Sequence, residues 1–300
     1  MDKYYKKWFG FLALPAAILF LMVIIIPFVF GILYSFSAWR GTYFVGGEHF
    51  YNAWVWFENY VEAFKSEKFI KAFVNTIQFT LIAVVVINVV SLGLSLMLTN
   101  IKKLSGVYRA IFFMPNLLGG LALGYIWQFI FEIVYSQILF GEGDKGIIHI
   151  EALCNMTQNH TKAMFALVIL ASWQMAGYMM LIYITGLNNI PLDLYEAASI
   201  DGATALQRFR HITLPMLMPS FTIVFFMTLA NCFKLLDQNV ALTDGKFDTR
   251  LLAFQILRTV KDKTPPDYGL AQAQAVIFFV LIAAVTLVQV SITKKKEVEA

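Results

Sequence analysis

Charged residues are scarce in this 300-residue chain, at 14% of the total. Soluble globular domains carry about 25% charged residues, so the deficit excludes an ordinary water-soluble fold. Hydrophobic residues make up 59% of the chain, and its mean hydropathy is +0.68. Together these values indicate a protein that is solvated by lipid.

Several kinds of site are also missing from the sequence. The two cysteines, Cys154 and Cys232, lie in different surroundings and give no disulfide framework. The four histidines fall in predicted loops, so no metal site is predicted. A nucleophile triad and a phosphate-binding G-x-x-x-x-G-K-[ST] segment are both absent. We therefore expect no enzymatic activity and no cofactor bound by this chain. The small, dispersed net charge of +4 does not favour a nucleic-acid partner.

Long apolar runs dominate the rest of the sequence, and each exceeds the about 20 residues that a bilayer core requires. The first, residues 9–37, is longer than the about 7–15 apolar residues of a cleavable signal peptide. We therefore expect it to be a retained membrane helix, which Pro15 and Pro27 would bend. The other five predicted spans are residues 71–99, 107–138, 163–187, 216–238 and 271–293. The predicted fold class is all-α, a polytopic membrane protein with six transmembrane helices.

Six spans place both termini on the same side of the membrane. Lysine and arginine are denser in the short segments on that side, which include the tails 1–8 and 294–300, than in the opposite loops. By the positive-inside rule, we expect these tails to be cytoplasmic. The loop 38–69 is rich in tryptophan and tyrosine, which favour the membrane–water boundary, and it is predicted to be extracytoplasmic.

The longest polar segment that is not a tail is residues 190–215, between the fourth and fifth spans. Pro191 suits the first turn of a short helix, and Gly202 can supply the positive φ that ends it. A second short helix would then lead to Pro215. Two short helices joined at a glycine form a projection on the cytoplasmic membrane face, where we expect a partner to dock.

The residues of this segment also carry a family resemblance. Glu196-Ala197-Ala198, Gly202, Ile212, Leu214 and Pro215 match the pattern E-A-A-x3-G-x9-I-x-L-P at every fixed position. The segment resembles the EAA loop of permeases in ATP-binding-cassette importers, which docks in a cleft of the ATPase subunit. The alternative is an amphipathic hairpin that only connects two spans. The ATPase-coupling residues that the resemblance implies are Tyr195, Glu196, Ala197, Ala198, Asp201, Gly202, Leu214 and Pro215.

From Phe57 to Gln289 the chain also resembles sugar permeases, in particular the maltose-permease-like first permease of carbohydrate uptake systems. Motifs that carry this resemblance are Phe57-Glu58-Asn59-Tyr60, Tyr108-Arg109, Met114-Pro115, Trp173, Leu242-Thr243-Asp244-Gly245 with Asp248-Thr249, and Tyr268-Gly269-Leu270-Ala271. A simple aromatic belt explains Phe57 and Tyr60 equally well. The family usually has Gly-Gly-Pro near Gly245, and the missing proline leaves the shape of that outer loop open.

The resemblance implies a type I importer permease (MetI-like) core over residues 70–293, in a bacterial or archaeal plasma membrane. It also implies a second homologous permease, two ATPase subunits that use ATP and Mg²⁺, and an extracytoplasmic sugar-binding protein. Alternatives are an importer for another polar solute, such as glycerol phosphate or a polyol, and an ion-coupled secondary carrier. The spans have no aspartate, glutamate or histidine at their centre, which disfavours the carrier.

Polar side chains inside membrane spans are costly and are therefore candidates for the substrate site. Such residues, together with positions carried over from the maltose-type permease, give the predicted substrate site: Asn116, Gly120, Trp173, Gln174, Met175, Thr228, Asn231, Cys232, Lys234 and Leu235. Small polar residues also join helices to one another, which is an equally good interpretation of Asn116, Ser172 and Asn231. Lys234 and Glu132 can instead extend to the outer interface.

Overall fold

The computed structural model describes residues 2–101, 103–141, 147–148 and 150–295. Within these residues every named element is helical, and the only β structure is three isolated bridges between residues 37 and 54. Five helices are long and apolar enough to cross a membrane, or six if a bent pair counts as one span. The prediction of an all-α polytopic fold is therefore confirmed. Most of the predicted tail 294–300 lies outside the described residues.

The chain forms two compact units, residues 1–70 with 255–280 and residues 71–254 with 281–300. The helices of the larger unit are α4 (Glu67–Thr99), α5 (Ser105–Phe113), η3 (Met114–Leu117), α6 (Gly120–Phe129), η4 (Ile130–Leu139), η6 (Glu151–Leu153), α7 (His160–Asn188), α8 (Leu192–Ile200), α9 (Ala205–Arg208), η7 (Phe209–Thr213), α10 (Leu214–Met216), α11 (Met218–Phe233), α12 (Asp237–Thr243) and η8 (Lys246–Asp248). Helix α4 begins in the smaller unit. Two further helices have residues in both units: α13 (Leu252–Lys261) and α14 (Tyr268–Lys294).

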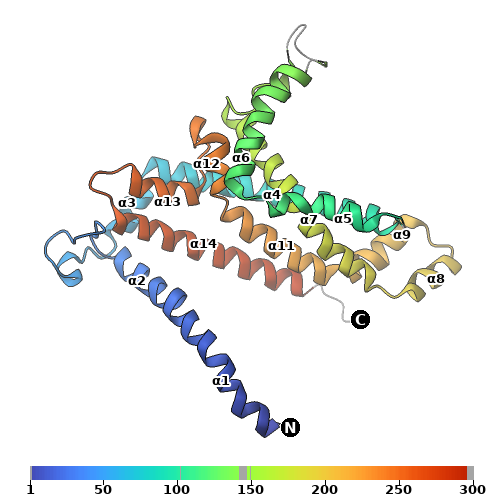
Figure 1. Ribbon diagram of the computed structural model, residues 1–300, viewed down its shortest axis with the longest axis horizontal. Coiled ribbons are helices and arrows are strands. Elements are labelled where there is room, and N and C mark those ends of the chain that lie inside the picture. The colour runs from blue at the N-terminus through green and yellow to red at the C-terminus, as the bar shows by residue number, and fades with distance from the viewer. Residues whose placement is uncertain (1, 102, 142–146, 149, 296–300) are drawn as a thin grey trace. The chain divides into compact units, whose positions relative to one another are not determined.

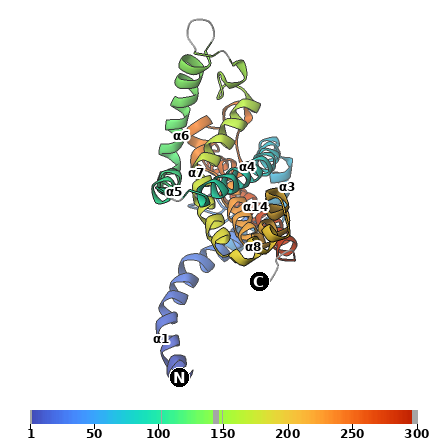
Figure 2. The same cartoon turned by 90° about the vertical axis from the view of Figure 1, so that its right-hand side faces the viewer.

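Helix α7 forms the core of the larger unit. Its buried residues extend from Ala163 to Ile184, and it packs against α5, α6, α11 and α12. Helix α12 in turn lies against α6 (Figure 1). The short helix α8 follows the C-terminal end of α7 in both views (Figures 1 and 2). The chain segment that holds the predicted coupling loop is thus fixed directly to the core helix.

Two of the predicted spans differ from the structure. The expectation of one continuous helix over 107–138 is wrong, because the backbone leaves the helical conformation at Leu118 and Gly119. Pro115 cannot donate a backbone hydrogen bond, which weakens the helix at this point. The fifth span, expected over 216–238, is one helix, α11, which ends already at Phe233. It begins at a bend of 67° next to Leu217, between Pro215 and Pro219, where the preceding helical segment Ala205–Met216 ends. The segment between the predicted fifth and sixth spans, residues 239–270, contains most of α12 and all of α13.

In the smaller unit, the first long helix consists of α1 (Asp2–Phe20), a π-helical turn η1 (Leu21–Ile25) and α2 (Ile26–Ser35). It starts before the expected residue 9, because polar residues extend its N-terminal end. The π turn directly precedes Pro27, where the regular hydrogen bond pattern loses a donor. The predicted loop 38–69 contains η2 (Phe50–Ala53) and α3 (Glu58–Lys65).

The side chain of Asn59 connects α3 to the end of the first long helix by hydrogen bonds. Its side-chain amide donates hydrogen bonds to the carbonyl oxygens of Ser35 at 2.8 Å and Ser37 at 2.9 Å. The Tyr60 hydroxyl lies 2.6 Å from Ser35 Oγ. Helix C-termini leave carbonyl groups without intrahelical partners, and Asn59 satisfies two carbonyls there. This contact gives Asn59 and Tyr60 a structural role beyond that of an aromatic belt.

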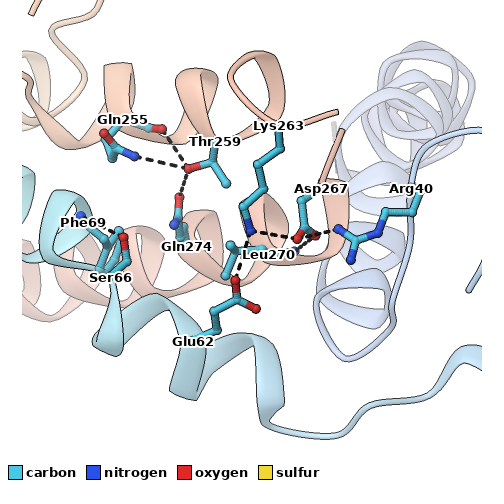
Figure 3. Close-up of polar contacts among 10 residues, drawn as sticks. All are labelled: Arg40, Glu62, Ser66, Phe69, Gln255, Thr259, Lys263, Asp267, Leu270 and Gln274. Carbon is cyan, nitrogen blue, oxygen red and sulfur yellow. Dashed lines mark hydrogen bonds and ion pairs between the residues drawn. The ribbon is translucent and has the colours of Figure 1, made fainter. Parts of the chain in front are cut away.

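Asp267 joins three segments of the smaller unit (Figure 3). Its carboxylate forms an ion pair with Arg40 and lies 3.1 Å from Lys263 Nζ, which lies 3.0 Å from Glu62 Oε1. The backbone N–H of Leu270 donates to its second oxygen at 3.2 Å. Burial alone would raise the pKa of Asp267, but the hydrogen bonds from Arg40, Leu270 and Lys263 outweigh it and lower this pKa. Burial likewise opposes the charge on Lys263, yet its two carboxylate partners raise the pKa of Lys263.

We predict that Asp267→Asn destabilises the protein by about 1–3 kcal/mol at neutral pH, since hydrogen bonds to charged groups are lost. The lowered pKa means that Asp267 stabilises the fold above its ordinary pKa of about 3.9 and loses this effect as the pH falls. The raised pKa of Lys263 means that its effect is lost only above about pH 10.4. Thermal unfolding of the purified protein between pH 3 and 7 should therefore show a weaker acid dependence in the variant.

Asp262→Asn is the matched control, because Asp262 forms a half-exposed i,i+4 pair with Arg258 at 3.5 Å. Such pairs contribute at most about 1 kcal/mol. Equal destabilisation by both substitutions would contradict the role assigned to Asp267.

Candidate coupling loop and substrate site

Residues 192–208 form two short helices that meet at a tight turn. Helix α8 ends at Ile200, and Gly202 adopts φ +74°. The N–H of Ala203 then donates to the carbonyl of Ala198 at 2.9 Å, and that of Gly202 to Ser199 at 3.2 Å, as in a Schellman-type helix end. A Cβ at Gly202 would meet nothing within 4 Å. The backbone conformation, rather than space, therefore favours glycine at this position.

Internal hydrogen bonds brace the loop. Arg208 donates from the second helix to Ser199 Oγ at 3.0 Å. The hydroxyl of Tyr195 lies 2.9 Å from Oγ1 of the buried Thr213. Thr204 and Gln207 form a capping box at the start of α9. Tyr195, expected to contact an ATPase, thus directs its hydroxyl into the loop. The sequence signal for the capping box was a threonine followed three residues later by glutamine.

The tip of the loop carries exposed apolar side chains. Ile200 is 87% exposed and Leu206 is 75% exposed, one on each side of Gly202. Among the other predicted coupling residues, Glu196, Ala197 and Asp201 are exposed, whereas Ala198, Leu214 and Pro215 are half-buried. Apolar side chains grouped next to charged ones at the end of a braced projection are typical of a protein-binding surface.

Two of the predicted substrate residues meet at the break between η3 and α6. The Gln174 side chain on α7 donates to the carbonyl of Leu118 at 3.2 Å and accepts from Gln238 Nε2 at 2.7 Å. Gly120 lies beside them, and a Cβ there would be 3.0 Å from the Gln238 amide carbon and 2.8 Å from Asp237 Cβ. Gln238 was not predicted, because it lies on α12, 64 residues from Gln174. We refer to Gly120, Gln174 and Gln238 as the amide cluster.

Other predicted residues surround this cluster without joining it. Trp173 is half-exposed and stands edge-to-face with Trp127, with ring centroids 5.7 Å apart. Asn116 is half-buried in η3, and Met175 is buried on α7.

The residues predicted on α11 lie mostly in the packed interior. Thr228 and Cys232 are fully buried. Leu235, just beyond the end of the helix, is almost fully buried. Asn88 on α4 donates to Thr228 Oγ1 at 3.3 Å and accepts from the Tyr183 hydroxyl at 2.7 Å. Thr228 therefore joins α11 to α4 and α7, as small polar residues do between membrane helices.

Asn231 and Lys234 are less enclosed. Asn231 is half-buried, and Lys234 is exposed directly after α11.

The family model and the similar proteins agree on one family for this chain. Residues 90–298 match the family described as binding-protein-dependent transport system inner membrane component. A protein named a probable permease of a starch degradation products transport system, from Thermoanaerobacterium thermosulfurigenes, is 36% identical over 99% of this chain and 98% of its own length. A multiple sugar-binding transport system permease from Streptococcus mutans is 32% identical over 99% of both chains.

A solved structure has the same fold. A chain of a bacterial ABC transporter involved in the import of the acidic polysaccharide alginate aligns over 98% of both chains with a TM-score of 0.76 and 19% identity.

We predict that Thr228→Val lowers the stability of the protein by about 0.5–1.5 kcal/mol, because the hydrogen bond from Asn88 is lost. Thr222→Val is the matched control, since the Thr222 hydroxyl donates to the Met218 carbonyl of its own helix and, within the described part of the chain, to no other helix. Denaturant unfolding in detergent measures both variants. If Thr222→Val destabilises the protein as much as Thr228→Val does, the role of Thr228 in helix packing is contradicted.

Proposed function

Because the chain belongs to the family of binding-protein-dependent transport system inner membrane components, we propose that it is the membrane-spanning subunit of an importer for sugars or short oligosaccharides. It pairs with a second, homologous permease, and an extracytoplasmic sugar-binding protein delivers the substrate. Two separate ATPase subunits hydrolyse ATP with Mg²⁺. The names of relatives that align along nearly the whole chain support the sugar assignment.

The braced loop 190–215 is the observation that carries this proposal. Hydrolysis in one subunit must be transmitted to another through a surface that is both exposed and stiff. The loop meets both needs, because Ile200 and Leu206 project from a tip that Tyr195, Ser199 and Arg208 hold in place. The tip inserts into a cleft of the ATPase, and Glu196 faces a basic residue there. The loop and both chain termini then lie on the cytoplasmic side.

The amide cluster supports an uncharged substrate. Amide groups both donate and accept hydrogen bonds, as sugar hydroxyls do. A phosphate ester would require arginine or lysine at the site, and Gly120, Gln174 and Gln238 carry no charge. Among sugars, we propose short α-linked glucose oligosaccharides, since one relative is named for starch degradation products and another, from Thermococcus litoralis, for trehalose and maltose.

We predict that Gly202→Val reduces ATP-driven uptake of maltotetraose roughly five- to thirtyfold, because a β-branched residue is strained at φ +74°. Gly202→Asn is the matched control, because asparagine tolerates the left-handed conformation and a side chain finds open space here. Uptake is measured in vesicles that contain equal amounts of each variant. Equal uptake by Gly202→Val and wild type would show that the loop only connects two spans.

Charge reversal provides a second test of the same loop. We predict that Glu196→Lys dissociates the ATPase or leaves its hydrolysis unresponsive to substrate, since like charges then meet at the interface. Glu196→Gln should have a smaller effect, because it removes an attraction without adding a repulsion. Co-purification and substrate-stimulated ATP hydrolysis measure the two effects, and normal values for Glu196→Lys would contradict the docking assignment.

For the substrate site, we predict that Gln174→Ala and Gln238→Ala each weaken sugar transport about two- to tenfold, the effect of one lost hydrogen bond. Because the two side chains share a hydrogen bond, the double variant should lose less than the two single effects combined. Gln78→Ala on the exposed face of α4 is the control. Wild-type uptake by both single variants across sugar concentrations would assign the cluster to helix packing alone.

A further inference from the structure

A polar pocket of about 500 Å³ lies in the larger unit, between the outer part of α6–η4, the segment before α7 and the end of α12. Its lining includes Tyr125, Gln128, Glu132, Gln158, Lys246 and Phe247. We call it the outer pocket. It shares no residue with the amide cluster, and its volume is within the about 300–1,000 Å³ of small-molecule sites.

The outer pocket and the coupling loop lie at opposite ends of α7. The pocket includes Gln158, just before this 29-residue helix, and the loop follows its last residue, Asn188. At 1.5 Å per residue the helix is about 43 Å long, enough to cross a membrane. With the coupling loop in the cytoplasm, the pocket therefore lies at the end of α7 that faces the side from which substrate arrives.

One wall of the pocket is a strained turn. Asp244, Phe247 and Asp248 have φ values of 48°, 53° and 58°, although none of them is glycine. A bulky residue such as Phe247 rarely adopts this conformation. Strain of this kind persists only where the surroundings enforce it, and it is concentrated at ligand-binding and catalytic sites.

Buried amides enforce this turn. The fully buried Asn239 donates to the carbonyl of Thr249 at 2.9 Å and to Thr243 Oγ1 at 3.1 Å, and it accepts from Leu251 N–H at 2.9 Å. From α4, Asn75 donates to the carbonyl of Asp248 at 2.5 Å. These hydrogen bonds therefore hold the turn in place against its strained conformation.

The groups that line the outer pocket complement a neutral sugar. Glu132 Oε1 is held by hydrogen bonds of 3.3 Å from Gln128 and from Thr157. Carboxylates accept hydrogen bonds from hydroxyl groups, whereas amides and the Lys246 ammonium donate to them. Tyr125 and Phe247, 59% and 52% exposed, offer apolar ring faces. The pocket is lined by two acidic side chains, Glu132 and Asp244, and one basic side chain, Lys246. This excess of negative charge disfavours an anionic ligand.

We propose that the outer pocket is a second carbohydrate-binding subsite of this chain, which holds a distal glucose unit of an oligosaccharide before the chain enters the translocation pathway. This proposal rests on the proposed function. It predicts selection by length, because a tetrasaccharide would occupy both the outer pocket and the amide cluster, whereas a disaccharide would occupy only the amide cluster.

The test is equilibrium binding of labelled maltotetraose and maltose to the complete importer in nanodiscs. Tyr125→Ala and Glu132→Gln should each weaken maltotetraose binding about two- to tenfold and change maltose binding less than twofold. Phe129→Ala is the matched control, because Phe129 is an aromatic residue of the same helix, is also 59% exposed and does not line the pocket. The importer with Phe129→Ala should bind both sugars as the wild type does.

Three results would overturn the proposal. If both pocket variants bind maltotetraose as the wild type does, the outer pocket is not a carbohydrate-binding subsite, and the proposed function is unaffected. A loss in Phe129→Ala equal to that in Tyr125→Ala would assign the effect to the packing of α6. A wild-type importer that binds neither sugar would contradict the proposed substrate class, and the subsite with it.

Discussion

A chain solvated by lipid must satisfy its backbone N–H and C=O groups within the protein, because hydrocarbon offers no partner. Long helices meet this requirement for most of the spans. Where a helix breaks, the freed groups need other partners, and these breaks are where polar side chains gather. The break at Leu118 exposes a carbonyl to Gln174, and the chain beyond α11 turns back to place Gln238 beside it. The requirement that favours helices therefore also locates the candidate substrate site.

The larger unit separates two tasks along one rigid helix. Helix α7 carries Gln174 on a buried face, leads at its C-terminal end into the loop around Gly202, and has the outer pocket at its N-terminal end. Movement of the loop by a partner would therefore be transmitted to the amide cluster without deformation of an intervening flexible segment. Hydrogen bonds among Thr228, Asn88 and Tyr183 connect α4, α7 and α11.

The sequence was sufficient to predict the apolar helices and the two-helix loop, because hydropathy and the spacing of Glu196, Gly202 and Pro215 are local signals. It did not reveal the break near Pro115, since membrane helices often tolerate proline. Nor did it identify Gln238, which was the last residue of the predicted fifth span and reaches Gln174 only through tertiary packing. The burial of Thr228 and Cys232 depends on which face of α11 meets α4 and α7, and a helix that is apolar all round carries no such information.

The central claim is that residues 190–215 dock into an ATPase subunit, and cross-linking tests it most directly. A photoreactive amino acid replaces Ile200, which is 87% exposed at the loop tip, or Phe129, which is exposed at the C-terminal end of α6. In membranes that contain the complete importer, the account predicts a cross-link to the ATPase from position 200 and none from position 129. No ATPase cross-link from position 200, with the chain assembled in the membrane, would contradict the account.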